Sequence, residues 1–549
     1  MKNFKLVVVL LWLPVMAFAQ EKGKLSGGLE SNTQYYVDDP KTGDFAEDNN
    51  FRTNTYLTLR YNYKNWFANA QLESYEPQAL LNYYPKYKGT NLGTYAIGYK
   101  SSKFEATLGY FYEQFGSGLA LRSWEDRQLG INNALRGVNI KYRPTDAIEL
   151  TALYGRQRDG FDVSDGDIFG FNSEIGLDQI LKFETSSLGL GLSYVGRSET
   201  LDISNPDFKS LTNVISTRLD FSEGSFYSSL EYVNKGKDVY QELGNIIDDK
   251  YFNGSALLFN LGYAKSGLGI DASFRRMENM SFYSERAMGS NIYNQDIINY
   301  LPALTKQHDY SLTNIYVYQS QPNLTFNPRG KAGEIGGQID VYYKFDKGTT
   351  LGGKHGTKIA FNFSNWSGLK GNFDIVDRTY DTSGFLAFGK NYFREASLEV
   401  RKKWSSDWSS IFTIVNTYYN KKFIEDTSGE INATILAGEA TYQFNSGKSV
   451  RLEAQHLFTK DDKKNWAGGT LEFNLNSKLS FFAADQYNYG NDDKDLQIHY
   501  YNIGGSFTKG ATRVALGYGR QRGGLLCVGG VCRYVPENTG FTLNLTTAF

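Results

Sequence analysis

Cysteine, histidine, methionine and proline are scarce in this sequence, and the shortage excludes several kinds of functional site. Among 549 residues there are 2 cysteines, 4 histidines, 5 methionines and 10 prolines. The histidines are scattered, so the sequence offers no metal-ligand cluster and no recognisable base for a serine nucleophile; they are His308, His355, His456 and His499. We therefore expect no enzyme activity, no metal and no cofactor.

Two further absences concern membrane helices and charged partners. Beyond the N-terminal leader, no segment contains the roughly 20 continuous apolar residues of a membrane-spanning helix. The formal net charge is -1, which gives no electrostatic footprint for a nucleic acid. A nucleic-acid partner is therefore not expected.

Residues 1–19 have the features of a secretory signal peptide. Lys2 and Lys5 precede an apolar run from Leu6 to Met16, and a small-residue cleavage motif ends at Ala19. This order of a basic start, an apolar centre and a small-residue site predicts an exported protein that is cleaved after Ala19.

Glycine, tyrosine and phenylalanine are abundant instead, at 56, 40 and 37 residues. In Val450–Gln455 the apolar residues occupy one face and the polar or charged residues the other, and this alternation recurs from end to end. Such strands, flanked by aromatic residues, are typical of barrels that face lipid outside and water inside. We predict an all-β fold, with residues 20–549 forming a single transmembrane antiparallel β-barrel of about 22 to 24 strands, integral to a Gram-negative outer membrane and in contact with its lipid.

Connections of two lengths separate the predicted strands. Tight polar turns, such as Lys64–Asn65 and Lys509–Gly510, alternate with longer segments. The longer connections are expected at Asp38–Asn50, Gly116–Leu135, Lys235–Tyr251, Glu278–Ala332, Ser367–Lys390 and Arg522–Asn538. In outer-membrane barrels the short turns face the periplasm and the long loops face outward.

The last strand indicates how the barrel is assembled. Phe541, Leu543, Leu545 and Phe549 fall on one face, and the chain ends on the aromatic ring of Phe549. A terminal aromatic residue on an alternating strand resembles the signal that barrel-assembly machinery reads in Gram-negative bacteria. We therefore expect this machinery as a partner during biogenesis, with Phe549 as the signal.

The two cysteines lie close together in the chain. Cys527 and Cys532 bracket Val528–Val531, which contains two central glycines. An exported protein meets oxidising conditions, and so short a gap with flexible glycines can bring the two sulfur atoms together. We predict a disulfide between Cys527 and Cys532.

The stretch Tyr112–Gly137 reads YEQFGSGLALRSWEDRQLGINNALRG and balances three acids against three arginines. Catalysis is not indicated, because Ser117 and Ser123 have no histidine nearby. Charges are tolerated inside a protein when they are paired and hydrogen bonded, so we predict that the loop around residues 113–136 folds into the lumen. Its network would comprise Glu113, Arg122, Glu125, Asp126, Arg127 and Arg136. The alternative is an ordinary extracellular loop with solvated charges.

The pentapeptide YGRQR occurs twice, at Tyr154–Arg158 and at Tyr518–Arg522, each time at the end of a predicted strand. Two interpretations remain open. The arginines line the lumen or the headgroup rim, or they form a basic patch for an anionic ligand.

Two parts of the sequence also resemble a known family. The motifs in Tyr112–Arg158 and in Gly519–Pro536, the latter reading GRQRGGLLCVGGVCRYVP, resemble a family of uncharacterised Bacteroidota outer-membrane barrels, similar to RemZ of the type 9 secretion and gliding system. The resemblance implies a non-enzymatic barrel that accompanies the type 9 translocon or the gliding machinery, with translocon subunits as partners. It supplies no catalytic residues. The residues alone leave a porin-like channel for hydrophilic solutes open, because a barrel of this size has a wide lumen unless something fills it.

Overall fold

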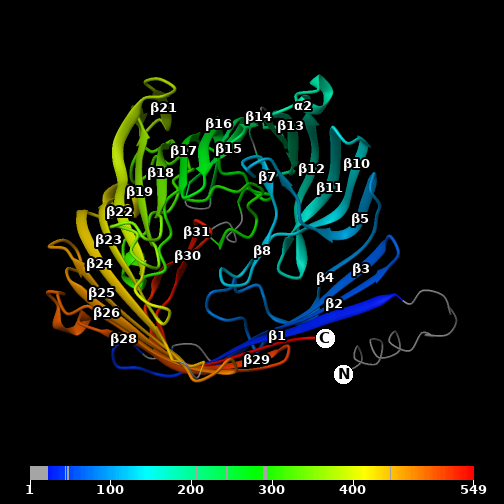
Figure 1. Ribbon diagram of the computed structural model, residues 1–549. Coiled ribbons are helices and arrows are strands. Elements are labelled where there is room, and N and C mark those ends of the chain that lie inside the picture. The colour runs from blue at the N-terminus through cyan, green and yellow to red at the C-terminus, as the bar shows by residue number, and fades with distance from the viewer. Residues whose placement is uncertain are drawn as a thin grey trace.

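The computed structural model describes residues 23–43, 45, 49–203, 205, 208–242, 245–287, 293–444 and 447–549. The predicted signal peptide, residues 1–19, lies outside these ranges. Within them, 24 strands form one antiparallel sheet that closes into a barrel (Figure 1). No helix among the described residues is long and apolar enough to cross a membrane.

The barrel strands run in chain order around the ring. They are β1 (Lys24–Tyr36), β2 (Phe51–Tyr63), β3 (Trp66–Glu76), β4 (Gly89–Lys100), β5 (Phe104–Phe111), β10 (Leu135–Thr145), β11 (Ile148–Asp159), β12 (Asp162–Gly176), β13 (Ser186–Ser198), β14 (Leu211–Glu223), β15 (Phe226–Glu242), β16 (Asn245–Lys265), β17 (Leu268–Glu278), β18 (Gly333–Phe345), β19 (Thr357–Leu369), β22 (Phe388–Lys403), β23 (Trp408–Asn420), β24 (Glu430–Gln443), β25 (Ser449–Phe458), β26 (Trp466–Asn474), β27 (Leu479–Tyr487), β28 (His499–Lys509), β29 (Thr512–Gln521) and β32 (Asn538–Ala548).

Short elements lie in the connections. They are β6 (Gln114–Phe115), β7 (Leu121–Arg122), β8 (Glu125–Asp126), β9 (Ile131–Asn132), α2 (Leu177–Leu181), η2 (Ser311–Asn314), β20 (Gly371–Asp374), β21 (Thr379–Thr382), α3 (Lys421–Ile424), η3 (Lys494–Leu496), β30 (Gly524–Val528) and β31 (Val531–Val535).

The ring closes between the last strand and the first. Gly540–Ala548 of β32 pairs with Gly28–Tyr36 of β1, so the described strands of the barrel sheet leave no free edge. The closed antiparallel architecture and the number of strands confirm the predicted fold class.

The alternation of residues places lipid-facing and lumen-facing side chains as expected for such a barrel. In β14, the outward residues Ile215 and Leu219 are 55% and 45% exposed, whereas the inward residues Val214 and Ser216 are buried. Outward positions on neighbouring strands carry the same kind of exposed apolar side chain.

One predicted connection is wrong. The segment Lys235–Tyr251 is not a loop, because β15 and β16 continue as a paired hairpin up to Glu242 and Asn245. Val239 and Tyr240 belong to this extension, and β-branched and aromatic residues favour strands. The hairpin therefore continues through most of the segment that was expected to be a loop.

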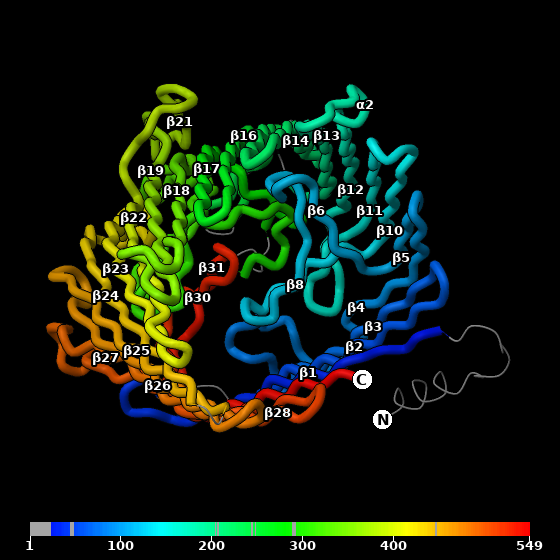
Figure 2. The backbone as a smooth tube through the Cα atoms, in the orientation of Figure 1, coloured from blue at the N-terminus to red at the C-terminus, as the bar shows by residue number. Residues whose placement is uncertain are grey.

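Four connections fold into the lumen, as Figures 1 and 2 show. They are residues 77–88 after β3, 112–134 after β5, the described residues 279–287 and 293–332 after β17, together called segment 279–332, and 522–537 after β29. We call them the plug segments. Because neighbouring strands run in opposite directions, all four leave from the same end of the barrel, opposite to the end where β1 starts and β32 stops.

The plug packs on an apolar belt of the inner wall. Along β12 to β17, each strand contributes one fully buried apolar side chain to a common cluster: Ile168, Val195, Val214, Val233, Ala256 and Met277. Phe115 and Leu121 of one plug segment and Phe282 and Ile298 of another pack against this belt. Along β12 to β17 the lumen face is therefore apolar where these plug segments pack, rather than wet along its whole height.

Candidate functional site

The plug segments are hydrogen bonded to one another. Between residues 112–134 and 279–332, the Tyr300 amide donates to the Gly118 carbonyl over 2.9 Å, and the Asn133 side chain donates to the Ile297 carbonyl over 3.1 Å. These contacts join segments that are more than 150 residues apart in the chain. The two segments therefore form one body inside the barrel.

The third segment, 522–537, joins the same body. The Ala303 amide donates to the Gly530 carbonyl over 2.8 Å, and Arg533 Nη1 donates to the Leu129 carbonyl over 2.5 Å. Gly530 has a φ of 80° and lies so close to Ala303 that a side chain would collide with its carbonyl, which requires glycine at this turn.

A disulfide joins Cys527 and Cys532 within this hairpin, with the sulfur atoms 2.09 Å apart. Cys532 is 3% exposed. Its sulfur lies 4.0 Å from the Tyr318 carbonyl oxygen in segment 279–332. The bridge thus lies where the hairpin meets the rest of the plug.

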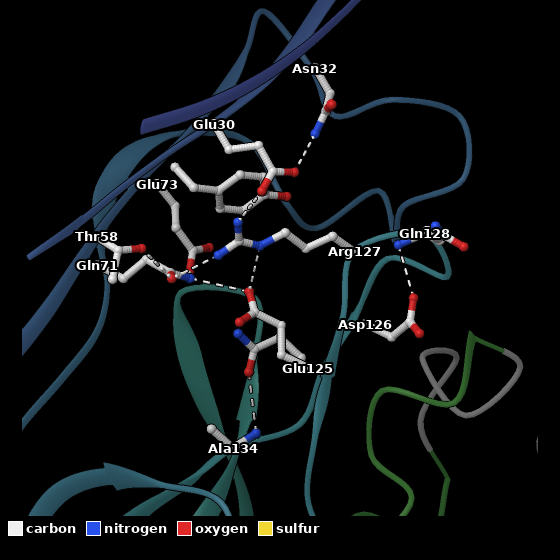
Figure 3. Close-up of polar contacts among 12 residues, drawn as sticks. Glu30, Asn32, Thr58, Gln71, Glu73, Glu125, Asp126, Arg127, Gln128 and Ala134 are labelled. Carbon is white, nitrogen blue, oxygen red and sulfur yellow. Dashed lines mark hydrogen bonds and ion pairs between the residues drawn. The ribbon is translucent and has the colours of Figure 1, made fainter. Parts of the chain in front are cut away.

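Arg127 is the centre of one charge network between the plug and the wall (Figure 3). Its guanidinium binds Glu125 over 3.1 Å, Glu30 of β1 over 2.5 Å and the Gln71 amide oxygen of β3 over 2.9 Å. It also lies 4.1 Å from the ring centroid of Tyr56. Burial lowers the pKa of Arg127, but the carboxylates of Glu125 and Glu30 outweigh it and raise that pKa above its ordinary value.

A second, fully buried ion pair lies beside this network. Arg158 binds both carboxylate oxygens of Glu73, over 2.6 and 2.9 Å, and both side chains are 0% exposed. Glu73 also accepts hydrogen bonds from Tyr75 and from Gln71, the residue that binds Arg127. The two networks are therefore linked through one amide.

The plug segment 77–88 covers these charges with aromatic rings. Tyr83 and Tyr87 pack with Tyr56 and Tyr75 in one buried cluster. The Tyr83 hydroxyl donates to the Arg127 carbonyl over 2.9 Å. Excluding water in this way strengthens the ion pairs that the rings surround.

Glu113 and Arg122 lie elsewhere in the plug. Glu113 binds Lys141 and the Asn139 amide of β10, each over 2.7 Å. Arg122 stacks on the ring of Tyr300, 3.8 Å from its centroid, and its guanidinium has a cation–π contact there.

Asp126 and Arg136 are not part of a shared network with Arg127. The Asp126 carboxylate accepts hydrogen bonds from the backbone amides of Gln128 and Leu129, each over 2.9 Å, and so stabilises the local turn. Arg136 lies on the outward face of β10 and is exposed. The six predicted network residues therefore divide into separate contacts.

We expect Arg127→Ala to weaken the attachment of the plug. Its side chain is 26% exposed, so we expect a loss of about 1.5 to 3 kcal/mol, the range for hydrogen bonds to charged groups. The denaturation midpoint in detergent measures it. Arg136→Ala, which removes an exposed arginine on the outward face of β10, is the control, and equal midpoints for the two variants would contradict an attachment by Arg127.

Sequence reasoning missed a clamp on segment 279–332. Arg286 binds Glu199 over 2.9 Å and Asp238 over 2.7 Å, and Asp238 also binds Arg197 over 2.8 Å. Arg286 is 1% exposed. These partners are 40 or more residues away in the chain, and no local pattern in the sequence marks them.

The buried carboxyl of Asp296 makes the plug sensitive to pH. Burial, and then the nearby carboxylates of Asp159 and Glu285, raise the pKa of Asp296 to about 8, although Lys86 opposes this. The folded protein therefore holds a proton that the unfolded chain releases, and the Asp296 contribution to stability falls as pH rises from about 4 to about 8.

Asp296→Asn should flatten this part of the pH profile. The variant keeps the shape of the side chain but holds no ionisable group, so its unfolding midpoint should fall less than that of the wild type between about pH 5 and about pH 8. Unfolding measured over this range checks it. Parallel profiles for the two proteins would contradict the assignment.

The terminal residue Phe549 lies at the end of the barrel where β1 starts. Its backbone amide and carbonyl both pair with Gly27, each over 2.9 Å. Its ring is 66% exposed. Among the described residues, no group of three or more histidine, cysteine, aspartate or glutamate side chains is placed to hold a metal ion.

Comparison with known proteins gives a family and distant structural likenesses. A family model described as "Family of unknown function (DUF6029)" matches residues 1–549. No curated protein matches the chain.

Among solved structures, the chain is similar to the P pilus usher (PapC) translocation pore, with 9% identity over 96% of this chain and 99% of that chain and a TM-score of 0.42. It is similar to the siderophore receptor PirA from Pseudomonas aeruginosa, with 9% identity over 96% and 81% and a TM-score of 0.42. It is also similar to a BenF-like porin from Pseudomonas fluorescens Pf-5, with 9% identity over 96% and 99% and a TM-score of 0.37. These distant likenesses do not bear on what this chain does.

Proposed function

The chain belongs over its whole length to this family of unknown function, and from that premise we propose that it is a non-enzymatic, integral outer-membrane barrel with a lumen obstructed by its own loops. In this proposal it works as an accessory component of a larger envelope assembly rather than as a free diffusion channel.

One observation carries the proposal: the plug segments are bonded to one another as well as to the wall. A loop that merely narrows a pore needs contacts to the wall alone. Here the Tyr300 amide reaches Gly118 and the Ala303 amide reaches Gly530, so moving one segment breaks contacts with the others. A plug of this kind favours a barrel whose outer loops and rim meet other proteins.

The resemblance of Tyr112–Arg158 and Gly519–Pro536 to Bacteroidota barrels suggests which proteins these are. We propose subunits of the type 9 secretion translocon or of the gliding machinery. The barrel-assembly machinery, reading Phe549, and outer-membrane lipid are the other proposed partners.

A second candidate function is a porin-like channel for hydrophilic solutes. A cavity of about 610 Å³ lies against the inner wall from β13 to β18 and favours it. Polar side chains form part of the lining of this cavity, among them Asp220, Ser229, Asn260, Asp271 and Gln338. Such a surface suits small polar solutes, which would pass if the plug moved aside.

An affinity pull-down separates the two functions. The protein is tagged just after Ala19, which leaves Phe549 undisturbed, and is recovered from native membranes in mild detergent. Reproducible recovery of translocon subunits is expected. Recovery of the barrel alone, together with steady conductance of the purified protein in planar bilayers, would favour the channel instead.

A further inference from the structure

We propose that the lipid-facing wall carries a binding site for the phosphate group of an outer-leaflet lipid, formed by Arg136 of β10 and Arg156 of β11. This inference goes beyond the proposed function. It rests on that proposal only in placing the barrel in an outer membrane.

The two arginines are direct cross-strand neighbours. Arg136 and Arg156 are paired in the ladder between β10 and β11, which puts their Cβ atoms about 4.5 to 5.5 Å apart. Arg136 shares its face of β10 with Ile140, and Arg156 shares its face of β11 with Tyr154. Ile140 and Tyr154 are exposed outward-facing side chains, so both guanidiniums lie on the side that meets lipid.

The register places this pair at the boundary of the apolar band. One row across the wall reads Tyr110, Arg136, Arg156 and Asp167. The adjacent row, two residues further along each strand, reads Leu108, Val138, Tyr154 and Phe169. A polar row directly beside an aromatic and aliphatic row is what a headgroup boundary requires. It lies at the end of the barrel from which the plug segments leave.

The protein balances the charges of this row only in part. Like charges directly opposite each other on neighbouring strands are destabilising. Asp167 compensates Arg156, whose Nε donates to it over 2.8 Å. No ion pair among the described residues includes Arg136, so the row retains one positive charge in excess.

Asp167 also fixes the geometry of the site. It accepts a hydrogen bond from the Tyr154 hydroxyl over 2.8 Å as well as from Arg156. Arg156 binds Asp167 through its Nε, and Arg136 is hydrogen bonded to the Tyr110 side chain. Each guanidinium has five N–H donors, so both arginines keep further donors for a ligand. Two adjacent guanidiniums match the oxygen atoms of a phosphate, which they bind through paired hydrogen bonds.

The ligand is a lipid phosphate because of what surrounds the arginines. The row of Leu108, Tyr154 and Phe169 continues directly from the site toward the middle of the wall. Acyl chains attached to the phosphate would lie along these side chains, and their contact adds to the charge interaction. A soluble phosphate ion makes no use of that apolar surface.

The two arginines of the first YGRQR motif point to opposite sides of the barrel wall. Residues two apart on a strand normally face the same side, but a β-bulge between Arg156 and Arg158 shifts the register. Arg156 consequently faces lipid while Arg158 is buried against Glu73 inside. In this motif Arg158 therefore faces the lumen and Arg156 faces outward. The proposed anionic ligand would be bound by Arg156 together with Arg136.

Native mass spectrometry of the folded, detergent-purified barrel tests the site. The probe is a bis-phosphorylated lipid A, compared with the same lipid after its phosphates are removed. We expect the phosphorylated lipid to be retained, and Arg136→Gln to weaken retention about tenfold, which corresponds to the loss of one charge-assisted contact of about 1.4 kcal/mol or more. Arg156→Gln should have a similar effect.

Arg394→Gln is the matched control. Arg394 is also outward and exposed, but its ladder partners are Asn365 and Tyr418 rather than a second arginine. Equal retention by Arg136→Gln and Arg394→Gln, or equal retention of both lipids by the wild type, would overturn the inference. Displacement of the lipid by about 10 mM inorganic phosphate would also overturn it in favour of a soluble-anion site.

The outcome is separable from that of the proposed function. The measurement uses folded barrel in detergent and needs no translocon subunit, so a missing lipid signal from heat-resistant, folded protein overturns the lipid site alone. Fractionation of the chain away from the outer membrane would overturn the placement on which both depend.

Discussion

Arg158→Ala is expected to lower the free energy of unfolding of the barrel by about 3 to 5 kcal/mol, the usual cost of removing one partner of a buried ion pair. Both partners are 0% exposed, so solvent does not screen the carboxylate of Glu73 that remains. Tyr75 and Gln71 still donate to Glu73, but neither carries a positive charge. Unfolding by guanidinium in detergent, followed through tryptophan fluorescence, measures the loss.

A double variant separates the lost attraction from the stranded charge. With Glu73→Gln added to Arg158→Met, no buried charge is left without a partner, and apolar replacements of buried pairs are often close to neutral. The double variant should therefore be more stable than Arg158→Ala. If the two are equally unstable, the pair contributes through packing against Tyr87 and not through its charge.

The barrel strands can be predicted from the sequence because the pattern that indicates them is local. Alternation within ten residues, as in Val450–Gln455, decides which side chains face lipid, and that pattern repeats on every strand. The start of the barrel also forms a strand, β1, since it has the same alternation. Where charged residues interrupt the pattern, as in Lys235–Tyr251, ladder pairing with the neighbouring strand prevails.

The plug can be predicted from the sequence only in part, because its contacts join residues that are far apart in the chain. The balanced charges of Tyr112–Gly137 indicate an inward loop, and Arg127 does bind the wall. The charge balance of the segment does not predict that Arg136 faces lipid, because the direction of its side chain depends on the register of β10. Residues 77–88 do not have the balanced acids and arginines that predict an inward loop. Pro77 and Pro85 indicate only that strand structure is interrupted there.

Arg286→Ala is the second substitution with a large expected effect, and it addresses movement of the plug. Arg286 holds segment 279–332 to Glu199 and Asp238 at the wall. Removing its guanidinium leaves Arg197 as the remaining arginine partner of these two carboxylates. We expect a loss of about 3 to 5 kcal/mol and a raised conductance in planar bilayers, because the segment then detaches more often.

Arg329→Ala is the control in the same segment. Arg329 is 26% exposed and lies 3.7 Å from Asp426, so its loss should cost less than about 1 kcal/mol and leave conductance at the wild-type level.

If Arg286→Ala lowers stability while conductance stays at that level, the other plug contacts suffice to keep the lumen obstructed. The barrel then works through its outer surface, and solute passage through the cavity at β13 to β18 is excluded as its main role. If conductance rises with the loss of stability, the clamp at Arg286 is the element that a partner would have to release to open the lumen.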